Sequence, residues 1–208
     1  MWDIEENLRK EGHRFIVGID EAGRGPLAGP VVAAAVVMPV GLTIPGLRDS
    51  KKMTPRQREE IYQCIFGCAQ AIGIGIVSHR MIDKINILQS TYLAMKRAIN
   101  RLTAPIDYVI VDGYPIPGLN YPQKGIIHGD AFCFSIAAAS VVAKVTRDRI
   151  MVRMGDFFPQ YGFAVHKGYP TQSHLDALAR YGPCPIHRFS FSPVRRCYER
   201  RLPMNAGV

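Results

Sequence analysis

Apolar residues in this chain gather into short continuous runs and into longer stretches with helical spacing. Continuous, β-branched runs predict strands at residues 14–20, 31–38, 72–77, 108–111 and 125–128. Helical spacing and start signals predict helices at residues 54–71, 81–102, 132–154 and 171–181. Because strands come first and helices alternate with them later, the pattern indicates an α/β fold whose mixed central β-sheet is flanked by helices.

The length of the chain bears on its domain organisation. Its 208 residues are enough for one sizeable core and few for two, and no linker, repeat or low-complexity tract divides them. We therefore predict a single domain over residues 1–208. From about residue 181 the chain is strongly basic, with five arginines between Arg188 and Arg201 against the acid Glu199. We expect residues 181–208 to form a small helical C-terminal extension.

The composition favours a polyanionic partner. Lysine and arginine number 26 against 17 acids, which gives a formal net charge of +9. A basic surface attracts nucleic acid, but such surfaces also occur on proteins that bind none. Charge alone therefore leaves nucleic-acid binding and an ordinary basic surface equally open.

Cysteine usage and the apolar runs indicate a cytoplasmic protein. The five cysteines form no Cys-x-x-Cys pair, which argues against a zinc ribbon and for reduced thiols. The N-terminus is acidic and lacks the apolar core of a signal peptide. The longest apolar runs, at residues 31–38 and 131–143, are too short to span a bilayer. We expect a soluble protein without a membrane partner.

Carboxylates follow three of the predicted strands. Asp20 and Glu21 end the first, Asp112 ends the fourth, and Asp130 comes shortly after the fifth. A single Asp in such a place is usually a turn former or a helix cap, but strand ends in an α/β sheet can converge on one crevice. Two carboxylates about 4 Å apart repel by roughly 4 kcal/mol at an effective dielectric near 20. A converged set would need divalent cations, and a pair of cations suits in-line phosphoryl displacement.

The glycine-rich segment after these acids could also be a phosphate-binding loop. Gly23-Arg24-Gly25 is not followed by a third glycine at the spacing of the dinucleotide fingerprint. Pro26 and Pro30 oppose the helix that this fingerprint requires. The chain has no Gly-Lys-Ser/Thr sequence either. These observations exclude a nucleotide cofactor.

Several sequence blocks occur together in the order of one known family. They are Asp20-Glu21-Ala22-Gly23-Arg24-Gly25-Pro26-Leu27-Ala28-Gly29-Pro30, Asp49-Ser50-Lys51-Lys52, Val111-Asp112-Gly113, Gly129-Asp130, Ile136–Ser140 with Ala143–Asp148, His166-Lys167-Gly168-Tyr169 and His187–Phe191. With these blocks the chain resembles type 2 ribonuclease H (ribonuclease HII), in its bacterial-like single-domain form, over nearly all residues after 14. Type 3 enzymes usually have Gly-Lys-Gly at the glycine segment and an extra N-terminal domain, so the likeness favours type 2.

The resemblance implies a ribonuclease H-like fold and an endonuclease that uses Mg²⁺ or Mn²⁺, with two divalent ions during catalysis. Such an enzyme hydrolyses the RNA strand of RNA–DNA hybrids and cuts 5′ of ribonucleotides embedded in duplex DNA, leaving 3′-hydroxyl and 5′-phosphate ends. It thereby removes misincorporated ribonucleotides and RNA primers in DNA replication and repair. The family's catalytic, metal-binding acids map onto Asp20, Glu21, Asp112 and Asp130. A monomer is expected.

Substrate-binding residues also follow from the resemblance. The reader of the 2′-hydroxyl maps onto Gly23-Arg24-Gly25, with Tyr169 stacking on the sugar beside the scissile bond. Backbone uncovered at the two glycines can donate to and accept from a 2′-hydroxyl, the group that separates ribose from deoxyribose, and Arg24 can hold the adjacent phosphate. His166 is expected to have a structural or positioning role. Further contacts to the nucleic-acid backbone are expected from Lys51, Lys52, Lys144 and Arg147, of which the last two could instead pair with the acids.

Two other functions stay open on the residues alone. A different two-metal nuclease of a related fold would share the acids but would also cut all-DNA duplexes. A non-catalytic basic protein would bind nucleic acid with a steep salt dependence, but would have no use for Asp20 and Glu21 together. Cleavage of duplexes with and without one ribonucleotide, in the presence and absence of metal, separates the three functions. The C-terminus shows no sliding-clamp motif, so recruitment is left undetermined.

Overall fold

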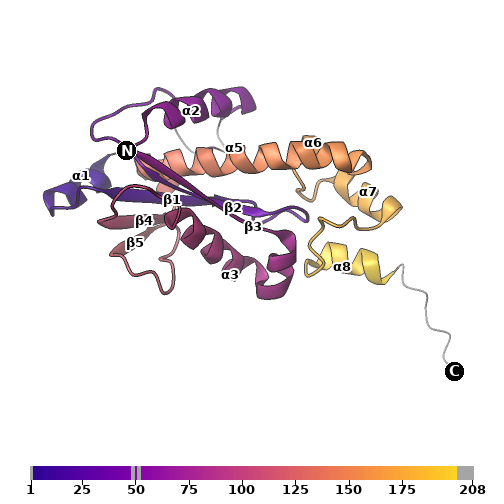
Figure 1. The fold of residues 1–208 in the computed structure, drawn as a ribbon. Helices are drawn as coiled ribbons and strands as arrows, with labels where there is room; N and C mark the ends of the chain where they lie inside the picture. Colours follow the sequence, from indigo (N-terminus) through magenta and orange to yellow (C-terminus); the bar gives the residue numbers. More distant parts are fainter. Residues whose placement is uncertain (1, 48–49, 51–52, 201–208) are drawn as a thin grey trace.

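A five-stranded mixed sheet forms the centre of the structure (Figure 1). This computed structural model describes residues 2–47, 50 and 53–200. The strands lie in the order β3-β2-β1-β4-β5, where β1 is Ile16–Ala22, β2 is Val31–Val37, β3 is Ala71–Val77, β4 is Tyr108–Asp112 and β5 is Gln123–Ile126. β1 pairs antiparallel with β2 and parallel with β4, while β2–β3 is antiparallel and β4–β5 is parallel. The predicted mixed sheet is confirmed.

Helices cover both faces of this sheet (Figure 1). On one face lie α2, Pro55–Cys68, and α5, Phe134–Phe157, against Ala34 and Val36 of β2. On the other face lies α3, His79–Ile99, which packs on the alternate residues of β2. Every residue of β2 is buried because both of its faces are covered, which explains its unbroken apolar sequence.

Glycines let the helices approach the sheet closely. A Cβ atom added at Gly75 of β3 would lie 1.9 Å from the carbonyl oxygen of Ala94 on α3. One added at Gly18 of β1 would lie 2.2 Å from the carbonyl carbon of Ser135 on α5. A side chain at either position would push a helix away from the sheet, so glycine is retained here although it weakens a strand.

Shorter helices lie at the edges of the sheet and around the C-terminal end of α5 (Figure 1). They are α1 Asp3–Lys10, α4 Gly129–Phe132, α6 Phe163–His166, α7 Gln172–Tyr181 and α8 Ser192–Glu199, with a 3-10 turn at Pro159–Tyr161. α8 supplies the helix expected after residue 181, but the residues before it are built into the core, since His187 and Arg188 are fully buried. Among the described helices, none has the length and apolarity needed to cross a bilayer.

The predicted elements are all present, and two of their ends differ in ways that matter for function. β1 continues to Ala22, so Asp20 and Glu21 lie inside the strand rather than at its end. The helix predicted from residue 132 is divided, because Cys133 is extended, with φ −114° and ψ 129°, between α4 and α5. Asp130 therefore belongs to a separate short helix.

Candidate active site

Three aspartates from different elements meet at one end of the sheet. β1 and β4 run parallel in a register that brings Asp20 and Asp112 side by side. Asp112 Oδ1 accepts a hydrogen bond from the N–H of Gly129 at 2.8 Å, which fixes the first turn of α4 and the Asp130 that it carries. One carboxylate oxygen from each aspartate lies within 4.8 Å of the other two. The structure thus brings together three of the four predicted acids, and we call them the acidic cluster.

Glu21, the fourth predicted acid, lies beside this cluster. Its Oε1 forms an ion pair with Arg24 Nη1 at 3.3 Å, and its side chain is 12% exposed. Since side chains alternate along a strand, Glu21 leaves β1 on the face opposite to Asp20. Glu21 is close enough for its charge to act on Asp20, but its carboxylate is not one of the three that converge.

Burial and repulsion act together on the acidic cluster. Burial first, and then the charges of Glu21 and Asp112, raise the pKa of Asp20 well above its ordinary value, although hydrogen bonds from Ser140 and from the Glu21 N–H oppose this rise. Asp20 and Asp130 are only 5% and 4% exposed. Carboxylate oxygens are the ligands that hard divalent cations prefer. The donor set therefore fits such a cation, whose charge would relieve the repulsion.

The segment Gly23-Arg24-Gly25 lies next to the acids because it directly follows β1. Gly23 has φ 101°, a conformation that favours glycine, and a Cβ there would lie 2.1 Å from Nε of Arg147. A Cβ at Gly25 would lie 3.8 Å from the ring of Tyr169, whose residue is 39% exposed. The structure thus places the predicted 2′-hydroxyl reader beside the predicted stacking residue.

Two fully buried arginines, which we call the arginine brace, hold this segment from behind. Arg188 donates four hydrogen bonds to carbonyl oxygens: those of Gly23 (2.6 Å), Arg24 (3.0 Å), Gly29 (3.0 Å) and Pro30 (3.1 Å). Arg147 donates three, to the carbonyl oxygens of Pro30 (2.9 Å), Lys167 (3.0 Å) and Ala28 (3.1 Å). The brace therefore turns the carbonyl groups of Gly23, Arg24 and residues 28–30 toward the interior.

The position of Arg147 differs from the expectation that it contacts substrate. Its guanidinium is fully buried and its donors are bound to backbone, so it supports the loop instead of facing a ligand. Burial lowers the pKa of Arg147 to about 10 and that of Arg188 to about 9. Both stay protonated at neutral pH, so two positive charges lie directly behind the glycine segment.

Lys144 has a different partner from the one that the sequence suggested. Its Nζ forms an ion pair with Asp148 of the same helix at 2.9 Å, rather than with the acidic cluster. The same Nζ lies 5.5 Å from the centre of the Tyr169 ring. Lys144 is thus at the edge of the predicted substrate site, with about a fifth of its side chain exposed.

Lys51 and Lys52 lie outside the described residues, but the residue before them can be placed. The hydroxyl groups of Ser50 and Ser140 are hydrogen-bonded at 2.8 Å, and Ser140 also forms a hydrogen bond with Asp20. Ser50 therefore connects this part of the chain to the acidic cluster.

Histidines fix the backbone that carries Tyr169. His166 Nδ1 accepts a hydrogen bond from the N–H of Gly168 at 3.2 Å, and His174 Nδ1 donates one to the carbonyl oxygen of Tyr169 at 2.9 Å. His187 Nε2 lies 3.1 Å from His174 Nε2. Burial lowers the pKa of all three histidines, that of His187 to about 3, so they are neutral at pH 7. This agrees with the positioning role expected of His166.

Sequence reasoning gave no role to Arg188, Ser140 or His174. Arg188 stands in the block His187–Phe191, and a lone arginine between aromatic residues is a usable signal of a buried, hydrogen-bonded cation. Ser140 and His174 carry no such signal, because single polar residues on a helix are common at any position.

Comparison with known proteins identifies the family. The family model described as Ribonuclease HII matches residues 17–194. The chain belongs to the ribonuclease HII family. A ribonuclease HII of Geobacter sulfurreducens is 54% identical over 196 residues, which cover 94% of this chain and 90% of that protein.

Solved structures of ribonucleases of this kind have the same fold. Ribonuclease H2 from Pyrococcus horikoshii OT3 has a TM-score of 0.74 at 26% identity, and the match covers 90% of this chain and 98% of that one. Bst-RNase HIII, in complex with Mn²⁺, has a TM-score of 0.72 at 16% identity, with 89% and 70% covered, a likeness in fold alone. The expected ribonuclease H-like fold is confirmed.

Family membership also decides the class of activity. The chain is a ribonuclease H, an endonuclease that hydrolyses the RNA strand of RNA–DNA hybrids. The ribonuclease HII family depends on divalent metal, and the acidic cluster offers oxygen ligands for it. The prediction of an enzyme rather than a non-catalytic binding protein is confirmed.

Proposed function

We propose that Asp20, Glu21, Asp112 and Asp130 hold the divalent cations, Mg²⁺ or Mn²⁺, and that the adjoining glycine segment and Tyr169 select a ribonucleotide. The observation that carries this proposal is the position of the acidic cluster, with its oxygens within 4.8 Å, at the end of the strand that leads into the glycine segment. A cut at this site falls 5′ of a ribonucleotide embedded in DNA and leaves 3′-hydroxyl and 5′-phosphate ends.

The arginine brace supports the selection of ribose. The brace holds the carbonyl groups of Gly23 and Arg24 toward the interior. In a planar trans peptide the C=O and the following N–H point in opposite directions. The N–H groups of Arg24 and Gly25 therefore point away from the brace, toward a ligand, where they can donate to a 2′-hydroxyl.

The side chains around the cluster have complementary tasks. Arg24 is 54% exposed in its pair with Glu21, and an exposed pair contributes little to stability, so Arg24 can exchange Glu21 for a substrate phosphate. This exchange releases the Glu21 carboxylate from Arg24. Tyr169 offers an exposed ring for stacking, and Lys144 beside it holds a backbone phosphate. A bound divalent cation supplies Lewis-acid stabilisation of negative charge at the reacting phosphate.

The wider setting follows the sequence predictions. We propose one catalytic domain that works as a monomer in the cytoplasm and removes misincorporated ribonucleotides and RNA primers. The family acts on RNA–DNA hybrids. Our proposal adds cleavage at a single ribonucleotide within DNA, where the glycine segment and Tyr169 must recognise one sugar.

Strand cleavage of a DNA duplex that contains one ribonucleotide tests this proposal. The reactions contain Mg²⁺, Mn²⁺ or chelator, and an all-DNA duplex serves as the control. Metal-dependent cutting at the 5′ side of the ribonucleotide alone is the expected result. Cutting of both duplexes would indicate a general two-metal nuclease, and cutting only within long hybrids would remove the proposed recognition of a single ribose.

A further inference from the structure

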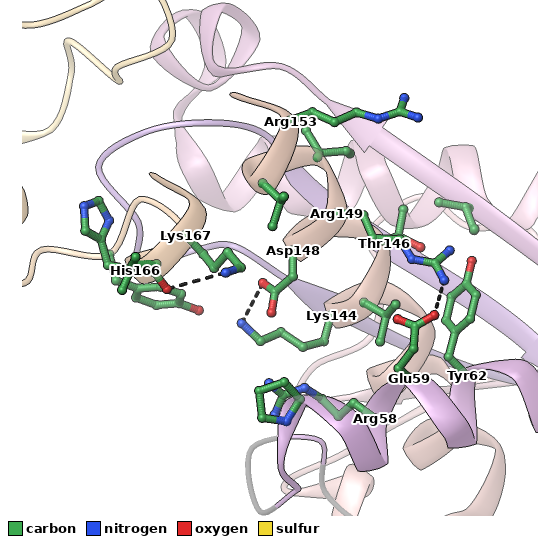
Figure 2. A pocket seen from close by; sticks show the side chains of 17 residues that line it. Arg58, Glu59, Tyr62, Lys144, Thr146, Asp148, Arg149, Arg153, His166 and Lys167 are labelled. Atoms are coloured by element: carbon green, nitrogen blue, oxygen red, sulfur yellow. Dashed lines mark hydrogen bonds and ion pairs between the residues drawn. The ribbon is translucent and has the colours of Figure 1, made fainter. Parts of the chain in front are cut away.

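A basic groove lies beside the proposed active site, between α2 and the C-terminal half of α5 (Figure 2). It has a volume of about 1030 Å³, and residues of α6 and the turn after it form its third side. We call it the α2–α5 groove. Among the described residues, five cationic side chains line it against the carboxylates of Glu59 and Asp148, which gives these residues a net charge of +3: Arg58, Lys144, Arg149, Arg153 and Lys167.

Both carboxylates of the groove are already paired. Glu59 forms an ion pair with Arg149, and Asp148 forms one with Lys144. Arg58 donates to the carbonyl oxygens of Ser50 and Met53, and Lys167 donates to that of Ala164, so these two cations interact with neutral groups that leave their charge in place. The excess positive charge of the groove is therefore available to an anionic ligand.

The cations of the groove are also close enough to act on one another. Figure 2 shows Lys167, Asp148 and Lys144 next to each other, with Arg58 on the facing helix. Burial lowers the pKa of Lys167, and although Asp148 raises it, Lys144 and Arg58 both lower it further. An anion bound here would relieve this repulsion.

The groove is continuous with the proposed substrate site. Lys144 and Tyr169 belong to both, and the Tyr169 ring in turn lies beside Gly25. From Lys144 to Arg153, α5 advances by about 13.5 Å at 1.5 Å per residue. This length corresponds to about four nucleotides of one strand at 3.4 Å each.

We propose that the α2–α5 groove binds the sugar–phosphate backbone of the duplex on one side of the scissile bond, a proposal that rests on the proposed function. Charge and continuity decide the occupant. An acidic peptide would also suit the charge, but it would have to share Lys144 and Tyr169 with the substrate, whereas the substrate's own backbone leaves the active site along them. Contact is made to phosphates, so the groove adds affinity without reading sequence.

Charge-neutralising variants test the groove. Arg153→Gln and Lys167→Gln are made singly and together, and Arg56→Gln is the matched control, since Arg56 lies on α2 outside the groove with 90% of its side chain exposed. Binding of a fluorescent duplex with one ribonucleotide is measured in chelator over a range of salt concentrations. Thermal unfolding of each variant shows that it is folded.

The double variant is expected to bind a duplex with long flanks about tenfold more weakly, with the slope of log K against log salt reduced by roughly two, about 0.9 per lost phosphate contact. Arg56→Gln keeps the wild-type affinity and slope. In cleavage assays KM rises while kcat stays the same, because the contact is made equally in ground and transition states.

Shortening the flanks locates the contact. Wild-type affinity should fall when one flank, and not the other, is cut to fewer than about four base pairs, and on that short duplex the double variant should equal the wild type. The proposal would be overturned by a double variant that binds every duplex with the affinity of Arg56→Gln, or by one whose affinity falls by the same factor at all flank lengths. Failure of the proposed function would instead appear as wild-type protein that binds these duplexes but does not cut at the ribonucleotide.

Discussion

The acidic cluster and the arginine brace lie close together, and each buries like charges, but they differ in what compensates those charges. The brace directs seven hydrogen bonds into backbone carbonyl groups and is complete within the protein. In the cluster, burial and neighbouring carboxylates raise the pKa of Asp20, so the protein itself disfavours the ionised form. The first arrangement is typical of structural support and the second of a site that awaits a cation.

The largest effect on activity is expected from a substitution in the acidic cluster. Asp112→Asn keeps an oxygen that can accept from Gly129 N–H but removes one ligand charge. We expect the rate of strand cleavage to fall by more than about a hundredfold, the scale of losing one electrostatic stabiliser of the transition state. Duplex binding should be equal or stronger, because repulsion of phosphate falls. Wild-type turnover in both Asp112→Asn and Asp20→Asn would remove the metal-site proposal.

A substitution in the arginine brace should mainly lower the stability of the folded protein. Arg188→Met leaves the carbonyl groups of Gly23, Arg24 and Gly29 without their guanidinium donor, while that of Pro30 keeps its hydrogen bond from Arg147. We expect a loss of about 3 kcal/mol in the free energy of unfolding, or roughly 6–12 °C in Tm, from the cost of unsatisfied buried groups. Thermal unfolding measures this change, and Arg195→Lys, an exposed arginine of α8, is the control.

A conservative variant separates support of the loop from support of the whole fold. Arg188→Lys keeps the charge but lacks the planar fork that spans several carbonyl groups. Its unfolding temperature should lie between that of the Arg188→Met variant and that of the wild type. Its rate of strand cleavage should fall more at a single embedded ribonucleotide than on a long hybrid. Equal losses on the two substrates, with unchanged Mn²⁺ binding by calorimetry, would assign Arg188 to general stability alone.

The sequence predicts the acidic side of this comparison much better than the basic side. Asp20, Asp112 and Asp130 come after apolar runs of the sequence, and charges at such places stand out. The brace depends on a contact between residues 188 and 23, far apart in the chain, which no local pattern contains. The same reason hides Glu5 of α1, which is 1% exposed and accepts from the N–H and hydroxyl of Ser135 at the start of α5.

Tyr169 lies between the two regions, and substitutions there separate recognition of the ribonucleotide from metal binding. Its ring is near Lys144, Arg147 and Gly25 but lies outside the acidic cluster. Tyr169→Ala should slow cutting at a single embedded ribonucleotide about tenfold, the scale of one lost stacking contact, while Mn²⁺ affinity is retained. Tyr169→Phe keeps the ring and should cut at nearly the wild-type rate. Unchanged rates in Tyr169→Ala would return this residue to a packing role.

The smallest effect concerns the stability of the metal-free protein. Because the pKa of Asp20 is raised in the folded state, the folded chain binds more protons than the unfolded chain between the ordinary and the raised pKa, and stability falls as pH rises through that window. Asp20→Asn removes this titration, so in chelator it should unfold at a higher temperature than wild type at pH 7 and at a similar one below about pH 4. Asp156→Asn, in which an exposed acid of α5 is changed, is the control for loss of one charge.

Added Mn²⁺ should raise the Tm of wild type more than that of Asp20→Asn, since a cation bound to the ionised site stabilises the folded state. If the wild type were instead more stable than Asp20→Asn in chelator at pH 7, the protein itself would stabilise the charges of the acidic cluster as completely as it stabilises those of the arginine brace.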